Sequence, residues 1–110
     1  MQVLLPLVLS LVLYAVPVDP PVDYQLVKAA AYVRLGYPGE SVSLLNSLNI
    51  SQKNGWFLSV RRILTARALI DEGRPADAIP ILKEEMGSER PGLRFFAGIY
   101  LARAHMAVKD

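Results

Sequence analysis

Few residues of this chain have side chains that could do chemistry. The 110 residues include no cysteine and a single histidine. Without cysteine the chain has no disulfides, no thiolate metal site and no cysteine nucleophile. His105 stands between Ala104 and Met106, and it has no second histidine with which to share a metal ion. We therefore interpret His105 as a packed or surface residue and expect no metal or other cofactor.

Adjacent carboxylates are the other candidate for catalysis. Glu84 and Glu85 lie near the end of a predicted helix and could suggest acid–base chemistry. Neighbouring positions on a helix point about 100° apart, so the two carboxylates do not converge on one substrate. The chain also has no glycine-rich phosphate motif, no nucleophile elbow and no pair of metal ligands on one helix face. We predict that the protein is not an enzyme.

Basic residues raise the question of nucleic-acid binding, because Arg61, Arg62 and Arg67 lie close together in the sequence. The whole chain has 12 Lys or Arg against 10 Asp or Glu, a net charge of +2. Its bases are interleaved with acids and the excess is modest. We expect the partner not to be a nucleic acid.

The first 18 residues supply much of the positive mean hydropathy of +0.30. Residues 3–18 are Val, Leu, Ala and Tyr interrupted by one serine and two prolines, and the first charged residue is Asp19. Three interpretations fit this apolar N-terminal helix: a membrane anchor or uncleaved signal, a cleaved secretory signal, or a helix packed on the rest of the fold. The first two make the protein membrane-associated or exported. The third leaves it cytoplasmic.

A proline-rich break at residues 19–22 separates this segment from the remainder. Prolines at 17, 20 and 21 remove backbone donors and fix φ, so a helix cannot run through them. We place the domain boundary here and predict a helical domain over residues 23–110.

Two similar helical hairpins follow the break. Apolar residues recur at three- and four-residue spacing from Asp23 to Leu35, Gly36 ends the helix, and a second helical run opens at Glu40. The same pattern returns 37 residues later, with matching pairs Ala29 and Ala66, Ala31 and Ala68, Gly36 and Gly73, Pro38 and Pro75, and Leu45 and Leu82. A last helix is expected from about Pro91 to Val108. The chain is thus predicted to be all-α with an internal repeat, as in helical solenoids.

The stretch from Ala66 to Leu82 resembles the tetratricopeptide repeat family. Its small, bulky and turn residues fall where the family pattern has them: Ala66, Leu69, Gly73, Ala78 and Ile79. The resemblance extends over residues 22–110 and implies about two and a half repeats of antiparallel helical hairpins. Ser41 departs from the pattern, which usually has alanine there. The opening aromatic of each unit is missing, and the spacing of 37 places an insertion within residues 49–55.

The resemblance also implies a binding site. In this family the first helices of the repeats line a concave face that holds a peptide. Carried over by position, the lining consists of Leu26, Ala30, Val33, Arg34, Ile63, Arg67, Ile70, Asp71, Ile99, Arg103 and Met106. Arg67 and Arg103 take equivalent places in successive units and could grip carboxylates or backbone carbonyls of a ligand. Alternatively, these arginines only solvate the surface.

Two aromatic pairs, at residues 56–57 and 95–96, are expected just before the first helices of units two and three. They pack between units or form an exposed patch for a partner.

These features predict a binding protein. The first hypothesis is a small adaptor or scaffold, held at a membrane by residues 3–18, that binds a peptide or helix of another protein in its groove. The second is a secretion- or assembly-type chaperone that shields a hydrophobic client, with the N-terminal helix as part of its fold. Because about three repeats are needed for independent stability, the last helix could cap one end, and the apolar N-terminal helix or a partner could cover the other. An oligomer is also possible.

Overall fold

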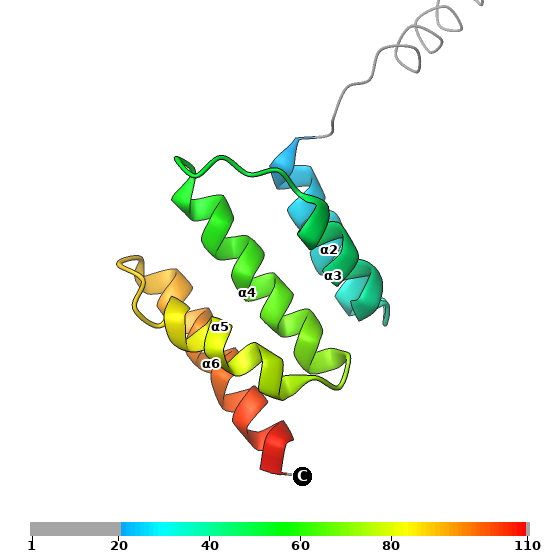
Figure 1. Ribbon diagram of the computed structural model, residues 1–110, viewed down its shortest axis with the longest axis vertical. Helices are drawn as coiled ribbons and strands as arrows, with labels where there is room; N and C mark the ends of the chain where they lie inside the picture. The colour runs from blue at the N-terminus through cyan, green and yellow to red at the C-terminus, as the bar shows by residue number, and fades with distance from the viewer. Residues whose placement is uncertain (1–20, 110) are drawn as a thin grey trace, which may run out of the picture.

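The computed structural model describes residues 21–109, and helices joined by turns and loops make up all of this part of the chain (Figure 1). The helices are α2 (Val22–Arg34), α3 (Pro38–Ser47), α4 (Gly55–Asp71), α5 (Pro75–Glu85) and α6 (Pro91–Lys109). No strand occurs among these residues. The predicted all-α class is confirmed.

The apolar N-terminal helix predicted at residues 1–18 lies outside the described residues, as do residues 19 and 20 of the break. The first described helix begins at Val22, one residue before the predicted domain start at Asp23. Within residues 21–109, no helix combines the length and the apolar character needed to cross a bilayer.

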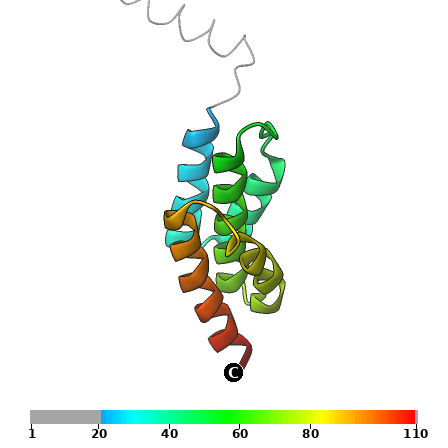
Figure 2. The ribbon, with the colours of Figure 1, turned by 90° about the vertical axis from the view of Figure 1, so that its left-hand side faces the viewer.

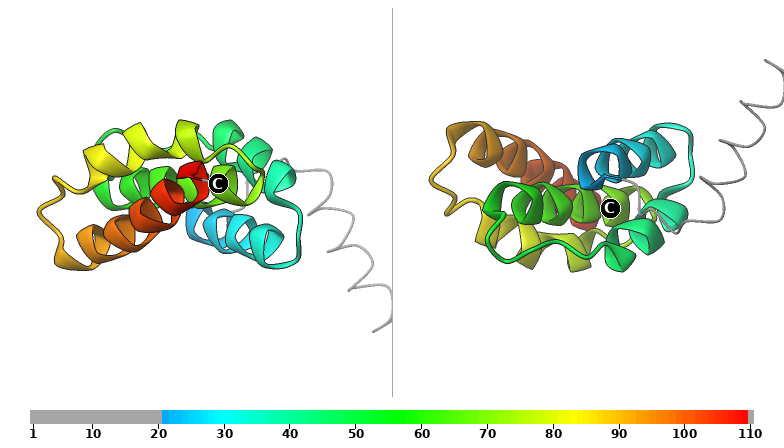
Figure 3. Two further views of the ribbon diagram at one scale, coloured as in Figure 1. Left: turned by 90° about the horizontal axis from the view of Figure 1, so that it is seen from below. Right: turned by 90° about the horizontal axis from the view of Figure 1, so that it is seen from above.

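Helix α4 lies at the centre of the fold and touches all four other described helices. Seen from either end of the molecule, α2 and α6 lie on one side of α4 and α3 and α5 lie on the other (Figure 3). The side view in Figure 2 shows the same division. The described helices α2 and α6 do not touch each other. A strip of α4 therefore lies between them with none of the other described helices over it.

The same turn closes both hairpins, 37 residues apart. Gly36 and Gly73 have φ of +89° and +86°. In each turn the glycine N–H donates to the carbonyl three residues earlier. The next N–H, of Tyr37 or Arg74, donates to the carbonyl five residues earlier at 2.8 Å in both cases. This is the Schellman arrangement, and a proline opens the following helix each time. The predicted glycine stops are confirmed.

The two turn glycines are expected to contribute equally to stability. Each of the single variants Gly36→Ala and Gly73→Ala should lower the free energy of unfolding by about 1 kcal/mol, because a left-handed backbone conformation disfavours a Cβ. A Cβ at either position would meet no other atom within 4 Å, so the cost is conformational and not steric. Urea unfolding followed by circular dichroism measures both variants.

Gly92→Ala is the matched control for that pair, because Gly92 lies in α6 without a positive φ and its Cβ would also be unobstructed. Alanine should stabilise a helix here, as it has the higher helix propensity. Equal stability of the Gly36→Ala variant and the unchanged protein would contradict the role of the left-handed turn.

Small residues let the two helices of each hairpin approach closely. Ala29 and Ser41 are fully buried between α2 and α3, as is the pair Ala66 and Ala78 between α4 and α5. The Ser41 hydroxyl donates a 2.8 Å hydrogen bond to the Ala29 carbonyl. This bond satisfies the buried hydroxyl and explains how serine is accommodated where the second hairpin has Ala78.

The core consists of two apolar clusters joined along α4. One lies between α4, α5 and α6 and contains Ile63, Ala66, Leu69, Ala78, Leu82, Leu93, Ala97 and Ala104. The other lies where α2, α3 and α4 meet and contains Leu26, Ala29, Leu45, Leu48 and Ile50. The partly buried Val60 of α4 packs against both clusters. The central helix therefore makes one body of the two hairpins and α6.

The structure differs from two of the predicted helix boundaries and confirms a third. Helix α3 begins at Pro38 and not at Glu40, since proline is favoured in a first turn. The aromatic pairs at 56–57 and 95–96 lie inside α4 and α6 and not before them. The Asn54 side chain accepts a 3.3 Å hydrogen bond from the N–H of Phe57, so α4 starts ahead of its aromatic pair. The predicted last helix is confirmed, at Pro91–Lys109.

Candidate functional site

An apolar hollow of about 240 Å³ opens between α4 and α6. It is lined by Trp56, Val60, Ile63, Leu64, Leu93, Phe96 and Tyr100. Ile63 and Leu93 are buried, whereas Trp56 and Phe96 keep 47% and 51% of their surface exposed. The hollow thus has a closed floor and an aromatic mouth that is open to solvent.

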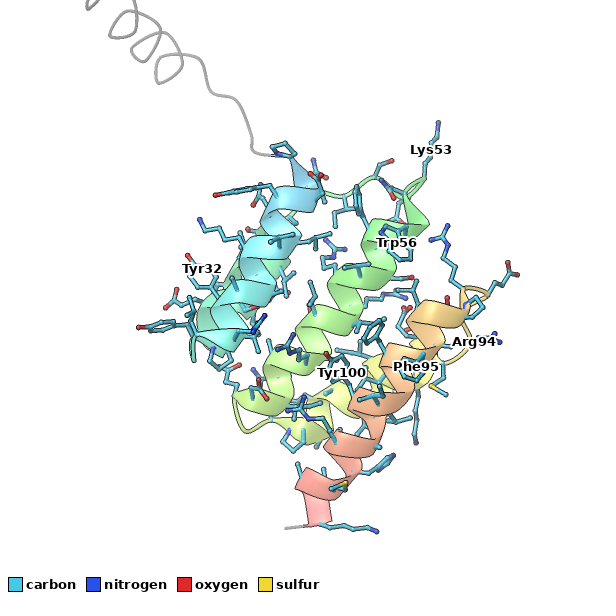
Figure 4. The ribbon with its side chains drawn as sticks, turned by 180° about the vertical axis from the view of Figure 1, so that it is seen from behind. Tyr32, Lys53, Trp56, Arg94, Phe95 and Tyr100 are labelled. Carbon is cyan, nitrogen blue, oxygen red and sulfur yellow. The ribbon has the colours of Figure 1, made fainter. Side chains whose placement is uncertain are left out.

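Three arginines border the hollow, each over an aromatic ring that lines it. The guanidinium of Arg90 lies 5.6 Å from the centre of the Trp56 ring. Those of Arg67 and Arg103 lie 6.0 and 5.6 Å from the centre of the Tyr100 ring. A cation over a ring face is attracted by the ring quadrupole. Figure 4 shows Trp56 and Tyr100 at two different heights along α4 and α6, so positive charge lies at both ends of the hollow.

Only one of these arginines is paired with an acid in the described part of the chain. Arg103 forms a 3.2 Å ion pair with Asp71 of α4. No described acid pairs with Arg67 or Arg90. The Nε of Arg67 is shielded from solvent and has no hydrogen-bond acceptor among the described residues. The site therefore presents donors that have no acceptor within residues 21–109.

The structure brings together four of the predicted site residues. Arg67, Asp71 and Arg103 meet around Tyr100, and Ile63 lines the hollow. Arg67 and Arg103, for which the resemblance predicts equivalent places in successive units, lie close together in space, because both guanidinium groups lie over the Tyr100 ring.

The other predicted residues lie elsewhere. Val33 and Leu26 of α2 are buried, and Ile70 packs against the larger core cluster. Ala30 is half-buried and Arg34 is exposed, on a helix that does not touch α6.

Two predicted residues on α6, Ile99 and Met106, are exposed but do not line the hollow. The predicted site thus contains the polar part of the observed one and misses most of its apolar part.

Sequence reasoning missed Tyr100, Val60, Leu64 and Leu93 as site residues, and treated Trp56 and Phe96 mainly as packing residues. All six sit at three- and four-residue spacing on α4 or α6, which is the pattern of a core-facing stripe. One signal in the sequence could have distinguished these site residues from core residues. The aromatic residues make the apolar stripe wider than one neighbouring helix covers, and such a wide stripe indicates an exposed apolar surface.

A second charged cluster joins α4 to α5 away from the hollow. Arg62 lies 3.0 Å from Glu84 and 3.2 Å from Glu85, and the Glu85 side chain is only 5% exposed. The hydrogen bond to the Glu85 carboxylate raises the pKa of Arg62 above its ordinary value. Arg61 donates a 2.9 Å hydrogen bond to the Leu48 carbonyl. This cluster holds helices and a loop together and is not part of the hollow.

His105 is exposed on α6. Among the described residues, no three His, Asp or Glu side chains gather where they could hold a metal ion.

Comparison of the chain with protein-family models, with curated proteins and with solved structures finds no match. The hollow and its surroundings are therefore the basis for the proposed function.

Proposed function

We propose that the protein is a small protein-binding module and not an enzyme, and that its binding site is the hollow between α4 and α6. The observation that carries this proposal is the open apolar mouth, with Trp56 and Phe96 half exposed above a buried floor. Aromatic residues and arginine are the types enriched at the centres of protein interfaces. Both types meet here on two packed helices, so the surface is preorganised.

The size of the hollow favours a protein side chain as its occupant. Pockets for drug-sized molecules and cofactors hold about 300–1,000 Å³ and bury most of their ligand. The hollow, at about 240 Å³, is smaller and open on one side. It suits one or two bulky side chains that anchor a larger partner outside.

The architecture we propose for the module is tetratricopeptide-like. Two features support it: the turns at Gly36 and Gly73 have the same hydrogen bonds, and small buried residues occupy equivalent positions in both hairpins. In such an arrangement α2, α4 and α6 would be the first helices of successive units. The hollow would then lie on the concave face, and α6 would be the first helix of an incomplete third unit.

Within this proposal the protein acts as an adaptor or scaffold, with residues 3–18 as its attachment to a membrane. The chaperone alternative is favoured by a different observation. Large apolar residues are exposed along both outer helices, namely Tyr24 and Val27 on α2, Leu35 directly after it, and Phe95, Ile99 and Met106 on α6. A chaperone would use such surfaces for a hydrophobic client, and removal of residues 1–20 would then leave an aggregating domain.

The two adjacent phenylalanines of α6 provide the test of the proposed site. Peptides selected from a displayed random library on the full chain are the probes, with the fluorescence of Trp56, the single tryptophan, as the readout. Phe96→Ser should weaken their binding at least about tenfold, because truncating a central interface anchor costs 2 kcal/mol or more. Phe95→Ser should change it less than about twofold, as rim residues contribute little.

Phe95 is a matched control because it is the same residue type on the same helix, is 64% exposed and does not line the hollow. Failure to select any peptide that changes the Trp56 fluorescence, or equal binding by the Phe96→Ser and Phe95→Ser variants, would contradict the proposed site.

A further inference from the structure

We propose that the hollow binds an acidic helical segment of another protein. The segment inserts a bulky apolar side chain between α4 and α6, and it places carboxylates on Arg90 at one end of the hollow and on Arg67 and Arg103 at the other. The inference rests on the proposed function and adds the chemistry of the partner.

Acidic and basic residues are distributed unequally over the described helices. Helices α3 and α5 carry one Lys and four Asp or Glu. Helices α2, α4 and α6 carry two Asp and eight Lys or Arg, namely Lys28, Arg34, Arg61, Arg62, Arg67, Arg94, Arg103 and Lys109. The guanidinium groups of Arg61 and Arg62 are bonded to Leu48 and to the acids of α5. Positive charge still dominates the helices that form the hollow, which favours an acidic partner.

The three arginines at the hollow have N–H donors that the described residues leave without acceptors. A guanidinium stacked on a ring keeps its N–H donors at its edge, where a carboxylate can accept two parallel hydrogen bonds. Arg90 has no ion pair within residues 21–109, although Glu89 precedes it. The shielded Nε of Arg67 lacks an acceptor there, and Arg103 uses only Nη2 toward Asp71. An incoming carboxylate would accept hydrogen bonds from the accessible N–H groups of these guanidiniums, for which the described residues provide few acceptors.

The spacing of the two basic ends of the hollow suits a helical ligand. Arg90 lies over Trp56, and Arg67 follows Trp56 by eleven residues on α4. At 1.5 Å of rise per residue, the two ends are about 16 Å apart along the helix, or about three turns. A ligand helix with one acid at each end of a face and an apolar residue between them matches both the charges and the hollow.

The same geometry argues against nucleic acid. Single strands bind by stacking bases on exposed aromatic faces. Here one face of Trp56 and the Tyr100 ring are already occupied by arginine guanidinium groups. The net charge of +2 is also small for a protein that tracks phosphates. An anionic lipid surface would engage the arginines and has no side chain for the hollow.

The test uses the full chain and three synthetic helical peptides of about sixteen residues. All three carry leucine at the centre of one face, and they differ only at the two ends of that face, which hold Glu, Gln or Lys. Trp56 fluorescence and peptide anisotropy report binding. The Glu peptide should bind at least about tenfold tighter than the Gln peptide, and the Lys peptide should bind weakest. The preference should fade between about 0.05 and 0.5 M NaCl as screening increases.

Variants then assign the preference to the arginines. The double variant Arg67→Gln/Arg90→Gln should lose most of the preference for the Glu peptide, because the one arginine left at the hollow, Arg103, is already paired with Asp71. The control Arg94→Gln, on the same helix as Arg103, should keep the preference, because the Arg94 side chain points away from α4 (Figure 4).

Each contrary result has its own meaning. Equal binding of the Glu and Gln peptides by the unchanged protein would overturn the acidic partner and leave the apolar docking site in place. Absence of binding by all three would overturn both proposals. Binding to vesicles of phosphatidylglycerol that is lost in the double variant, without any preference among the peptides, would assign the arginines to a membrane and overturn the inference.

Discussion

Leu82→Ala is expected to lower the free energy of unfolding by about 3.5 kcal/mol, the middle of the range for truncating a buried leucine to alanine. The Leu82 side chain is completely buried on α5, within the cluster that joins α4, α5 and α6. The lost methyl groups leave a cavity that three packed helices cannot close without breaking other contacts. For a domain with total stability of about 5–15 kcal/mol, this is a large fraction.

Leu45 offers an internal comparison for this prediction. It holds the equivalent place in the first hairpin and is also completely buried. Leu45→Ala should therefore cost a similar amount, and each variant should lower the melting temperature by about 4–8 °C per kcal/mol. Val27→Ala serves as the control, because Val27 is 69% exposed and its truncation should be nearly neutral. A Leu82→Ala variant that melts like the Val27→Ala control would refute the packing described for this cluster.

Arg62→Ala is expected to lower the free energy of unfolding by about 2 kcal/mol. Removing the partner of a fully buried ion costs about 3–5 kcal/mol, because the remaining charge has no compensation. Glu85 is nearly buried and Arg62 is its only ion-pair partner in the described part of the chain. The loss is smaller than the full value because Arg62 is half exposed, so water also reaches the pair.

The acids of this cluster should respond less than the arginine. Glu85→Gln removes the buried charge and leaves an arginine that water can solvate, so we expect a loss below about 1 kcal/mol. Glu84→Gln should cost less again, because that ion pair is on the surface. Urea unfolding of the three variants tests this order, and a larger loss for Glu84→Gln than for Arg62→Ala would contradict it.

The pH dependence of this interaction follows from the raised pKa of Arg62, which results chiefly from its hydrogen bond to Glu85. A base whose pKa is higher in the folded state contributes stability that is complete below its unfolded pKa and is lost as the pH rises through the folded value. The contribution of the arginine should therefore stay constant through neutral and mildly alkaline pH. It should disappear only in strongly alkaline solution.

The helices and turns could be predicted from the sequence because local residues determine them. Gly36 and Gly73 supply the left-handed conformation, and the prolines at 38 and 75 open the next helices. The start of α4 was less predictable. It depends on a capping hydrogen bond from Phe57 to Asn54 within a polar loop, and such loops contain several residues that could cap.

The site was only half predictable, for a different physical reason. The predicted repeat relates Arg67 and Arg103 by position and so places both in the site. For Trp56 and Phe96 the pattern leaves packing between units and an exposed patch both open, because spacing alone cannot distinguish a buried apolar stripe from one that two helices leave exposed. Whether such a stripe is covered depends on how far α6 extends alongside α4, and this distance is a property of tertiary packing.

The unequal division of acids and bases among the helices affects how the domain is oriented as it approaches a charged partner. Opposite charges on opposite sides of a domain make an electric dipole, and a dipole turns in the field of a charged neighbour. The turning depends on the separation of the charges, so it persists in a chain whose net charge is only +2. At physiological ionic strength it acts within about 8 Å, the distance over which salt screens charge. An acidic surface at that range would rotate the domain until α2, α4 and α6 face it, and collisions would then begin with the hollow already turned toward the partner.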